Sequence, residues 1–166
     1  MKITVMATGG VGGYFGARLA AAGEDVHFIA RGAHLEALRA NGLTLKSANG
    51  DLHLRAVSAT DNPARIGAVD IVIFAVKQYD TESAAELIKP LIGEDTAVIS
   101  LQNGMDRSES LPSILGRNRI MGGAAYITGA EVAAPGVIAH AGKVARIVFG
   151  EFDGHRSPRA ERFLAA

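Results

Sequence analysis

The amino-acid sequence predicts an α/β fold in which a doubly wound, mostly parallel sheet carries helices on both faces. Apolar runs of strand length alternate with stretches of helical periodicity, which is typical of parallel sheets with crossover helices. The run 69–76 is almost wholly apolar, as expected of a strand covered on both faces. A glycine-rich segment, 7–13, separates the first apolar run from the first helical stretch. Together these features predict one Rossmann-type domain.

The N-terminal part of the chain predicts a strand, a helix, a second strand, a second helix and a pair of short strands. In the first helix, apolar residues recur at intervals of three or four, and Gly23 follows as glycine does just past a helix end. The predicted elements are a strand at 3–6, a helix at 11–22, a strand at 25–30, a helix containing Leu35 and Leu38, and paired strands at 43–46 and 52–57 around the turn dipeptide Asn49-Gly50.

The remainder predicts further strands and helices. They are strands at 69–76, 96–101, 119–125, 137–140 and 145–149, and helices at 84–91 and 107–115. Ser157 before Pro158 is typical of a helix start, with serine as the cap and proline in the first turn. We therefore expect a Rossmann domain at 1–154 and, at 155–166, the start of a helix that leads to a further domain. That short helix either docks on the domain or was meant to continue, and it frays if it does not dock. Its apolar Phe163 and Leu164 are candidates for self-association.

Composition limits the classes of function. Lys plus Arg and Asp plus Glu number 17 each, so the overall charge gives no reason to expect a nucleic acid or an anionic membrane as partner. The chain has no cysteine, and its five histidines lack metal-ligand spacing, so we expect no metal site. No apolar stretch approaches the roughly 18 residues of a membrane span. The N-terminus does not fit a targeting segment, and we expect a cytoplasmic protein.

The segment Ala7-Thr8-Gly9-Gly10-Val11-Gly12-Gly13 has the position and composition of a phosphate-binding turn. Gly9 and Gly12 match the second and third glycines of G-x-G-x-x-G, between a predicted strand and a predicted helix. Gly9 allows close approach to a pyrophosphate, Gly12 allows the helix to pack on the sheet, and the helix N-terminus offers N–H donors. Ala7 replaces the first glycine, which costs about 1 kcal/mol or more if φ is positive. The alternative, a glycine-rich loop that serves packing alone, is disfavoured by this context.

Arg31 indicates which dinucleotide is bound. It follows the second predicted strand, where an acidic residue would bind the ribose 2′-hydroxyl of NAD and an arginine would accommodate the 2′-phosphate of NADP. No Asp or Glu occupies 26–33. The sequence thus predicts NADP, against the alternative that Arg31 is an ordinary solvated charge.

Two more polar residues follow predicted strands at the carboxyl edge of the sheet, where ligands bind in open α/β folds. Lys77, after the run 69–76, is either a cofactor contact or an ordinary strand-end lysine. Asn103, after the strand 96–101, is either a ligand contact or a turn residue before glycine; its amide can both donate and accept hydrogen bonds. His140 is a lone histidine on a predicted strand, and we expect it to be structural or solvent-facing.

Taken together, these residues resemble the N-terminal domain of the ketopantoate reductase (2-dehydropantoate 2-reductase) family. The matching segments are GGVGGYFGARL at 9–19, ARGAHL at 30–35, VKQYD at 76–80 and LQNGM at 101–105. Their order and spacing hold from residue 1 to about 154, which is much more specific than the glycine motif alone. The resemblance implies NADPH-dependent reduction of a small 2-oxo acid, ketopantoate to pantoate in the namesake reaction of pantothenate biosynthesis.

The resemblance also implies roles for individual residues. Arg31 would contact the adenosine 2′-phosphate, Lys77 would face the cofactor, and Asn103 would lie near both the nicotinamide and the substrate. The expected cofactor-binding residues are Ala7, Thr8, Gly9, Gly10, Val11, Gly12, Arg31, Lys77, Asn103 and, where the family makes a further contact, Thr128. Asn103 is also the expected substrate-binding residue.

Two departures from the family pattern qualify this expectation. Ala7 replaces a glycine, and the family's proton-donating lysine and substrate-binding carboxylate belong to a helical C-terminal domain that we do not find in this sequence. We therefore expect no catalytic residue in this chain and little activity from it alone. Three functions stay open: the NADP-binding part of a ketopantoate reductase-like oxidoreductase, a stand-alone NADP-binding or sensing module, and one subunit of a split reductase completed by a helical partner.

Overall fold

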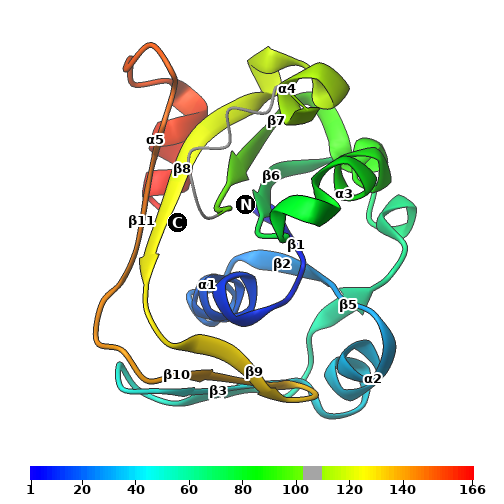
Figure 1. The fold of residues 1–166 in the computed structure, drawn as a ribbon, viewed down its shortest axis with the longest axis vertical. Helices are drawn as coiled ribbons and strands as arrows, with labels where there is room; N and C mark the ends of the chain where they lie inside the picture. Colours follow the sequence, from blue (N-terminus) through cyan, green and yellow to red (C-terminus); the bar gives the residue numbers. More distant parts are fainter. Residues whose placement is uncertain (103–109) are drawn as a thin grey trace.

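A computed structural model describes residues 1–102 and 110–166, and its strands form two sheets (Figure 1). The larger sheet has seven strands in the order β11-β8-β7-β6-β1-β2-β5, and the smaller has four in the order β4-β3-β10-β9. Neighbouring strands of the larger sheet are parallel except β11, which runs antiparallel to β8. The predicted Rossmann-like fold class is confirmed, and the second sheet is an addition to it.

The helices and strands follow the predicted order. The larger sheet contains β1 (Lys2–Met6), β2 (Asp25–Ile29), β5 (Ser58–Thr60), β6 (Val69–Phe74), β7 (Ile92–Ser100), β8 (Ile120–Ile127) and β11 (Ala145–Gly150). The smaller contains β3 (Leu43–Ser47), β4 (Leu52–Leu54), β9 (Ala130–Ala134) and β10 (Val137–His140). The helices are α1 (Gly10–Ala21), α2 (Gly32–Asn41), α3 (Thr81–Leu87), α4 (Ser110–Leu115) and α5 (Pro158–Leu164), with a 3-10 turn, η2 (Gln78–Asp80), before α3. Only β5 and β9 lack a counterpart among the predicted strands, and the predicted helix at 107–115 is described from Ser110 onward.

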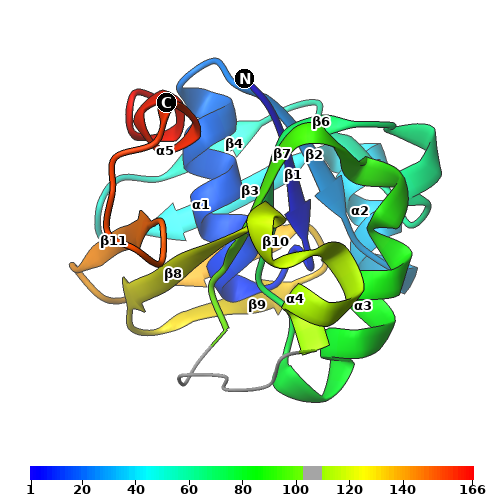
Figure 2. The same cartoon turned by 90° about the horizontal axis from the view of Figure 1, so that it is seen from above.

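Side chains of the central strands alternate between two hydrophobic layers. From β6, Ile71 and Ile73 pack on the face that carries α1, and Val72 and Phe74 pack on the face that carries α3 and α4. A run that is apolar throughout satisfies both faces at once, which explains why 69–76 shows no alternation in sequence. The two chain ends lie on the side of the molecule opposite the carboxyl ends of β1 and β2 (Figure 2).

The second sheet packs against the side of α1 that faces away from the larger sheet. The strands predicted around Asn49-Gly50 pair antiparallel as β3 and β4, but β3 also pairs in parallel with β10, far along the chain. Helix α1 contacts β1 and β2 on one side and β3, β9 and β10 on the other, while β8 and β11 curl around a third side (Figure 1). The fold therefore holds α1 between two sheets.

The C-terminal helix α5 docks on the domain. The Ser157 side chain caps it by accepting a hydrogen bond from the Ala160 N–H at 3.2 Å, as the sequence predicted. Phe163 is 6% exposed, and its ring centroid lies 4.9 Å from that of Phe149. Phe163 thus belongs to the domain's own core, whereas Leu164 stays exposed. No helix among the described residues is long and apolar enough to cross a membrane.

An ion pair fixes the start of α5. Arg159 Nε and Nη2 donate to the two carboxylate oxygens of Glu151 at 2.6 and 2.7 Å, and Ser157 Oγ donates to the same carboxylate at 2.6 Å. The side chains of Glu151 and Arg159 are only 10% and 20% exposed. The hydrogen bonds from Arg159 hold the pKa of Glu151 below its usual value.

We expect Glu151→Gln to lower the free energy of unfolding by about 1.5–3 kcal/mol at pH 7, because it removes a hydrogen-bonded charge from this pair. A carboxylate with a lowered folded pKa stabilises the fold above its unfolded pKa and loses that contribution as pH falls below it, toward the folded pKa. The difference between wild type and mutant in urea unfolding should therefore shrink below about pH 4.5. The control is Glu86→Gln, whose partner Lys89 is half exposed, with an expected effect within about 0.5 kcal/mol. Equal losses from the two mutants would contradict the assignment.

Candidate functional site

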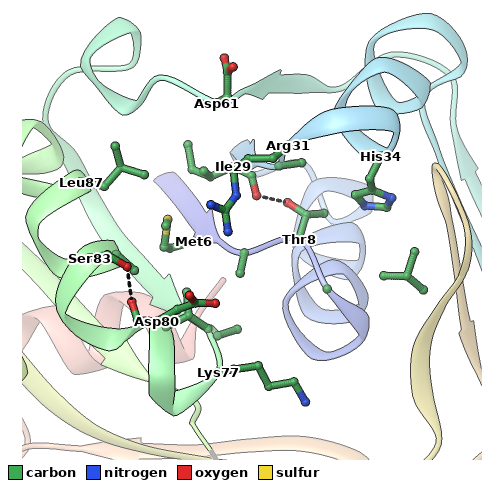
Figure 3. A pocket seen from close by; sticks show the side chains of 17 residues that line it. Met6, Thr8, Ile29, Arg31, His34, Asp61, Lys77, Asp80, Ser83 and Leu87 are labelled. Carbon is green, nitrogen blue, oxygen red and sulfur yellow. Dashed lines mark hydrogen bonds between the residues drawn. The ribbon is translucent and has the colours of Figure 1, made fainter.

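A pocket of about 450 Å³ lies at the carboxyl ends of β1, β2 and β6 (Figure 3). From β1, the sheet extends through β2 and β5 on one side and through β6, β7 and β8 on the other. In open α/β sheets, such a reversal of strand order is where ligands bind. The wall of the pocket includes the turn after β1, the segments that follow β2 and β6, one face of α3, one residue after β5 and one residue of β9.

The structure brings five of the expected cofactor residues into this wall, namely Ala7, Thr8, Gly9, Arg31 and Lys77. Gly10, Val11 and Gly12 continue from the turn into the first turn of α1. Thr128 is exposed between β8 and β9 and does not line the pocket. Asn103 lies outside the described residues.

The turn after β1 has an unusual backbone at Ala7. Its φ is +72°, and no other non-glycine residue in the described part of the chain has a positive φ. An L-residue in this region costs roughly 1–2 kcal/mol, so the first motif position here is one that glycine would occupy without strain. Strain of this kind persists where the surrounding structure imposes it, and it is often found at ligand sites.

Thr8 imposes the turn. Its backbone N–H and its side-chain hydroxyl both donate to the Ile29 carbonyl, at 3.0 and 2.9 Å. Thr8 is nearly fully buried, so both bonds are shielded from water. They join the end of β1 to the end of β2 next to the strained Ala7. The Thr8 side chain therefore holds the turn in shape.

The two motif glycines have different reasons to be glycine. A Cβ on Gly12 would collide with the Ala7 carbonyl oxygen and lie 2.8 Å from Val5 Cγ1, so Gly12 serves the contact of helix and strand. A Cβ on Gly9 would meet no protein atom within 4 Å, and Gly9 has an extended backbone that any residue can adopt. Packing and backbone conformation thus leave Gly9 without a requirement for glycine, which points to space needed by a ligand.

The N-terminus of α1 and two cations face the same pocket. The Gly13 N–H makes the first helical bond, to the Gly9 carbonyl, so the preceding N–H groups are the donors that a helix start offers to an anion. Arg31 and Lys77 lie on opposite sides of the pocket (Figure 3). Neither forms an ion pair with any residue in 1–102 or 110–166. This arrangement suits an elongated ligand with more than one anionic group.

Sequence reasoning missed two acidic residues and one apolar residue in the pocket wall. Asp61 follows β5, a strand of three residues that the sequence did not reveal, and it makes a loose, exposed pair with Arg39 at 3.7 Å. Asp80 lies in the turn after Lys77. Val132 belongs to β9, so the second sheet contributes to the site. For Asp80, the proximity to Lys77 in sequence was the available signal.

His34 was noticed only as part of a matching segment, yet it also lines the pocket. Its Nδ1 accepts a hydrogen bond from the Gly136 N–H at 3.1 Å, which joins α2 to the turn between β9 and β10. Burial lowers the pKa of His34, and the backbone of Thr8 acts in the opposite direction. The Gly136 N–H makes Nδ1 the acceptor, and this bond connects the pocket wall at His34 with the second sheet.

His140 is structural, as expected. It is 2% exposed, its Nδ1 lies 3.0 Å from Ser47 Oγ, and its ring packs on Tyr14 with centroids 4.7 Å apart. These contacts lie between α1 and the second sheet. No group of three or more His, Cys, Asp or Glu side chains in the described residues could hold a metal ion.

Comparison with known proteins matches residues 3–154 to the family model described as ketopantoate reductase PanE/ApbA. The chain is 37% identical to a 2-dehydropantoate 2-reductase of Mesorhizobium japonicum and 35% identical to an uncharacterized oxidoreductase, YkpB, of Bacillus subtilis, in each case over 96% of its own length. The crystal structure of 2-dehydropantoate 2-reductase from Geobacter metallireducens superimposes with a TM-score of 0.91 at 38% identity, covering 99% of this chain. The chain spans about half of these relatives, 54%, 52% and 54% of their lengths. D-mandelate dehydrogenase, solved with NADH and anilino(oxo)acetate, shares the fold at 22% identity with a TM-score of 0.85.

We expect Gly9→Val to abolish dinucleotide binding without a large loss of stability, because Gly9 lines the pocket and a Cβ there meets no protein atom within 4 Å. The matched control, Gly12→Ala, should lower the free energy of unfolding by about 1–3 kcal/mol, since its methyl group forces α1 away from β1. Urea unfolding and calorimetric titration with NADPH measure the two effects. A folded Gly9→Val chain that binds NADPH as wild type does would place the ligand elsewhere.

Proposed function

Because this chain belongs to the ketopantoate reductase PanE/ApbA family, we propose that it is the NADP(H)-binding part of an oxidoreductase that reduces a small 2-oxo acid. The observation that supports this best is the pocket itself. One cavity at the reversal of strand order is lined by the strained turn, by a position where a side chain meets only empty space, and by two cations without ion-pair partners among the described residues.

We assign the cofactor contacts from this geometry. The backbone of residues 9–12 would hold the pyrophosphate against the start of α1, Arg31 would hold the adenosine 2′-phosphate, and Lys77 would contact the cofactor from the opposite side. Bound NADPH supplies the hydride for reduction of the substrate carbonyl. Asn103 is proposed to orient the nicotinamide and the substrate, and Thr128 to make an outer contact from the turn between β8 and β9.

The substrate proposal comes from the relatives. Those named 2-dehydropantoate 2-reductase suggest ketopantoate as the 2-oxo acid and pantothenate biosynthesis as its purpose. The absence of cysteine is compatible with the cytoplasm, where we place the reaction. Because the chain spans about half of its relatives, we propose that a helical partner, in the same polypeptide or a separate one, provides the acid and the second wall of the substrate site.

Arg31→Ala should weaken NADP⁺ binding by about tenfold to a hundredfold, because a hydrogen bond to a charged group contributes roughly 1.5–3 kcal/mol. Binding of NAD⁺, which lacks the 2′-phosphate, should change by less than about twofold. Calorimetric titration of both dinucleotides measures the difference, with the exposed Arg162→Ala on α5, outside the pocket wall, as the control. Equal losses for NADP⁺ and NAD⁺ would make Arg31 a structural residue, and a wild-type preference for NAD⁺ would overturn the choice of cofactor.

We expect the 166-residue chain alone to oxidise NADPH with saturating ketopantoate far below the ordinary enzyme range of about 1–10³ per second. Hydride transfer leaves an alkoxide, and a positioned acid contributes about 10²–10⁴-fold to such reactions. Burial lowers the pKa of His34 in the pocket wall, which disfavours the protonated imidazole that could act as such an acid. The rate of NADPH absorbance loss measures turnover. A rate within the ordinary range would show that the chain contains its own acid.

A further inference from the structure

We propose that Thr81 and Gln102 form a hydrogen-bonded clamp that positions Lys77 for the dinucleotide. Thr81 is then a positioning residue, buried behind the pocket wall and acting through the lysine. The proposal rests on the proposed function, since it takes Lys77 to contact the cofactor. It adds a residue that the glycine motif and the strand-end cations do not reveal.

The clamp is a chain of hydrogen bonds that run in one direction. Ser100 Oγ donates to Gln102 Oε1 at 3.2 Å, and Gln102 Nε2 donates to the Thr81 hydroxyl at 2.7 Å. That hydroxyl in turn donates to the Gln78 carbonyl at 2.7 Å. Bonds arranged donor to acceptor in this way polarise one another, and Thr81 is only 4% exposed, so water does not replace its partners.

The clamp connects the loops that follow β6 and β7, beyond the last residue pair of these two strands. The pairing of β6 with β7 ends at Phe74 opposite Ser100. After that point, the segment that follows β6 continues to Lys77 and η2, and the segment that follows β7 continues to Gln102. The bond between Gln102 and Thr81 spans the two continuations and keeps the loop that carries Lys77 at a fixed distance from the end of β7.

The backbone that follows Lys77 is held at two successive carbonyls. The Asp80 N–H donates to the Lys77 carbonyl at 3.0 Å, and the Thr81 hydroxyl donates to the Gln78 carbonyl. These two bonds fix the backbone of the turn that follows Lys77. Figure 3 shows the lysine side chain extending from this turn along the pocket. A lysine side chain is flexible, so a fixed backbone reduces the freedom that must be lost when it binds an anion.

A local role for Thr81 is the competing explanation. A threonine hydroxyl often bonds the carbonyl three residues earlier at a helix start, and that bond alone would concern only α3. The contact from Gln102, which comes from a different strand, goes beyond this local pattern. A role in positioning Lys77 therefore has to appear as energetic coupling between Thr81 and Lys77, which a local role would not produce.

The experiment is a double-mutant cycle in the 166-residue chain, with Thr81→Val and Lys77→Ala made singly and together and NADPH affinity read by fluorescence titration. Valine keeps the shape of threonine and removes both hydrogen bonds. Thr81→Val should weaken NADPH binding by about threefold to tenfold in the wild-type chain, and by less than about twofold when Lys77 is already alanine. Thr81→Ser, which keeps the hydroxyl, should restore wild-type affinity.

Equal weakening by Thr81→Val with and without Lys77 would overturn the proposal, as would unchanged affinity in a folded Thr81→Val chain. If Thr81→Val fails to fold, the half-exposed Gln102 offers a milder variant, Gln102→Met, for which the same coupling with Lys77 is expected. If Lys77→Ala binds NADPH as tightly as wild type, the clamp proposal and the assigned Lys77 contact fail, while NADPH binding at the glycine turn stands. If wild type does not bind NADPH at all, both fail.

Discussion

The close approach of α1 to both sheets is the constraint on which the rest of this structure depends. A Cβ on Gly12 or Gly16 would overlap atoms of the central strands, and one on Gly10 or Gly13 would overlap atoms of β9 and β10. Each face of the helix thus has two glycines that allow the contact. A helix packed this closely against strands on both sides has little room to move, because protein interiors are close-packed. Its N-terminus is therefore fixed at the pocket before any ligand arrives, which lowers the cost of ordering the site on binding.

The same constraint explains the strain at Ala7. The chain must leave β1 and enter a helix that lies almost in contact with that strand, and the Ala7 carbonyl packs where a Cβ of Gly12 would be. Only a left-handed residue makes so abrupt a turn, and the two bonds from Thr8 to Ile29 hold it there. A glycine, as in the motif G-x-G-x-x-G, would relieve the strain, which this chain retains. Retention is tolerable because the packing around α1 stabilises the turn by more than the roughly 1–2 kcal/mol that the strain costs.

The sequence predicted the central sheet and the residues at its carboxyl edge, because these depend on local patterns. Apolar runs, helix ends and strand-end cations can be recognised within about ten residues. Arg31 and Lys77, which were recognised in this way, both line one pocket. The second sheet could not be predicted in this way. It depends on pairing of β3 with β10 across most of the chain, and on β9, whose alanine-rich sequence has little strand propensity. For that reason Val132 and Asp61, which reach the pocket from β9 and from the short β5, were missed.

The charge pattern of the pocket arises from residues that follow different strands of the larger sheet. Overall charge is balanced at 17 cationic and 17 acidic residues, so attraction for a phosphorylated ligand has to be local. The strands of the central sheet bring Arg31 and Lys77 to either side of the α1 N-terminus, while Asp61 and Asp80 stand near them at the edge. Carboxylates beside the cations repel a simple anion that has no donor for them. A nucleotide can donate to such carboxylates through its ribose hydroxyls and its exocyclic amino group. A pocket that mixes both signs around a helix N-terminus therefore suits the proposed nucleotide better than a simple polyanion, and this charge pattern depends on residues that only the folded chain brings together.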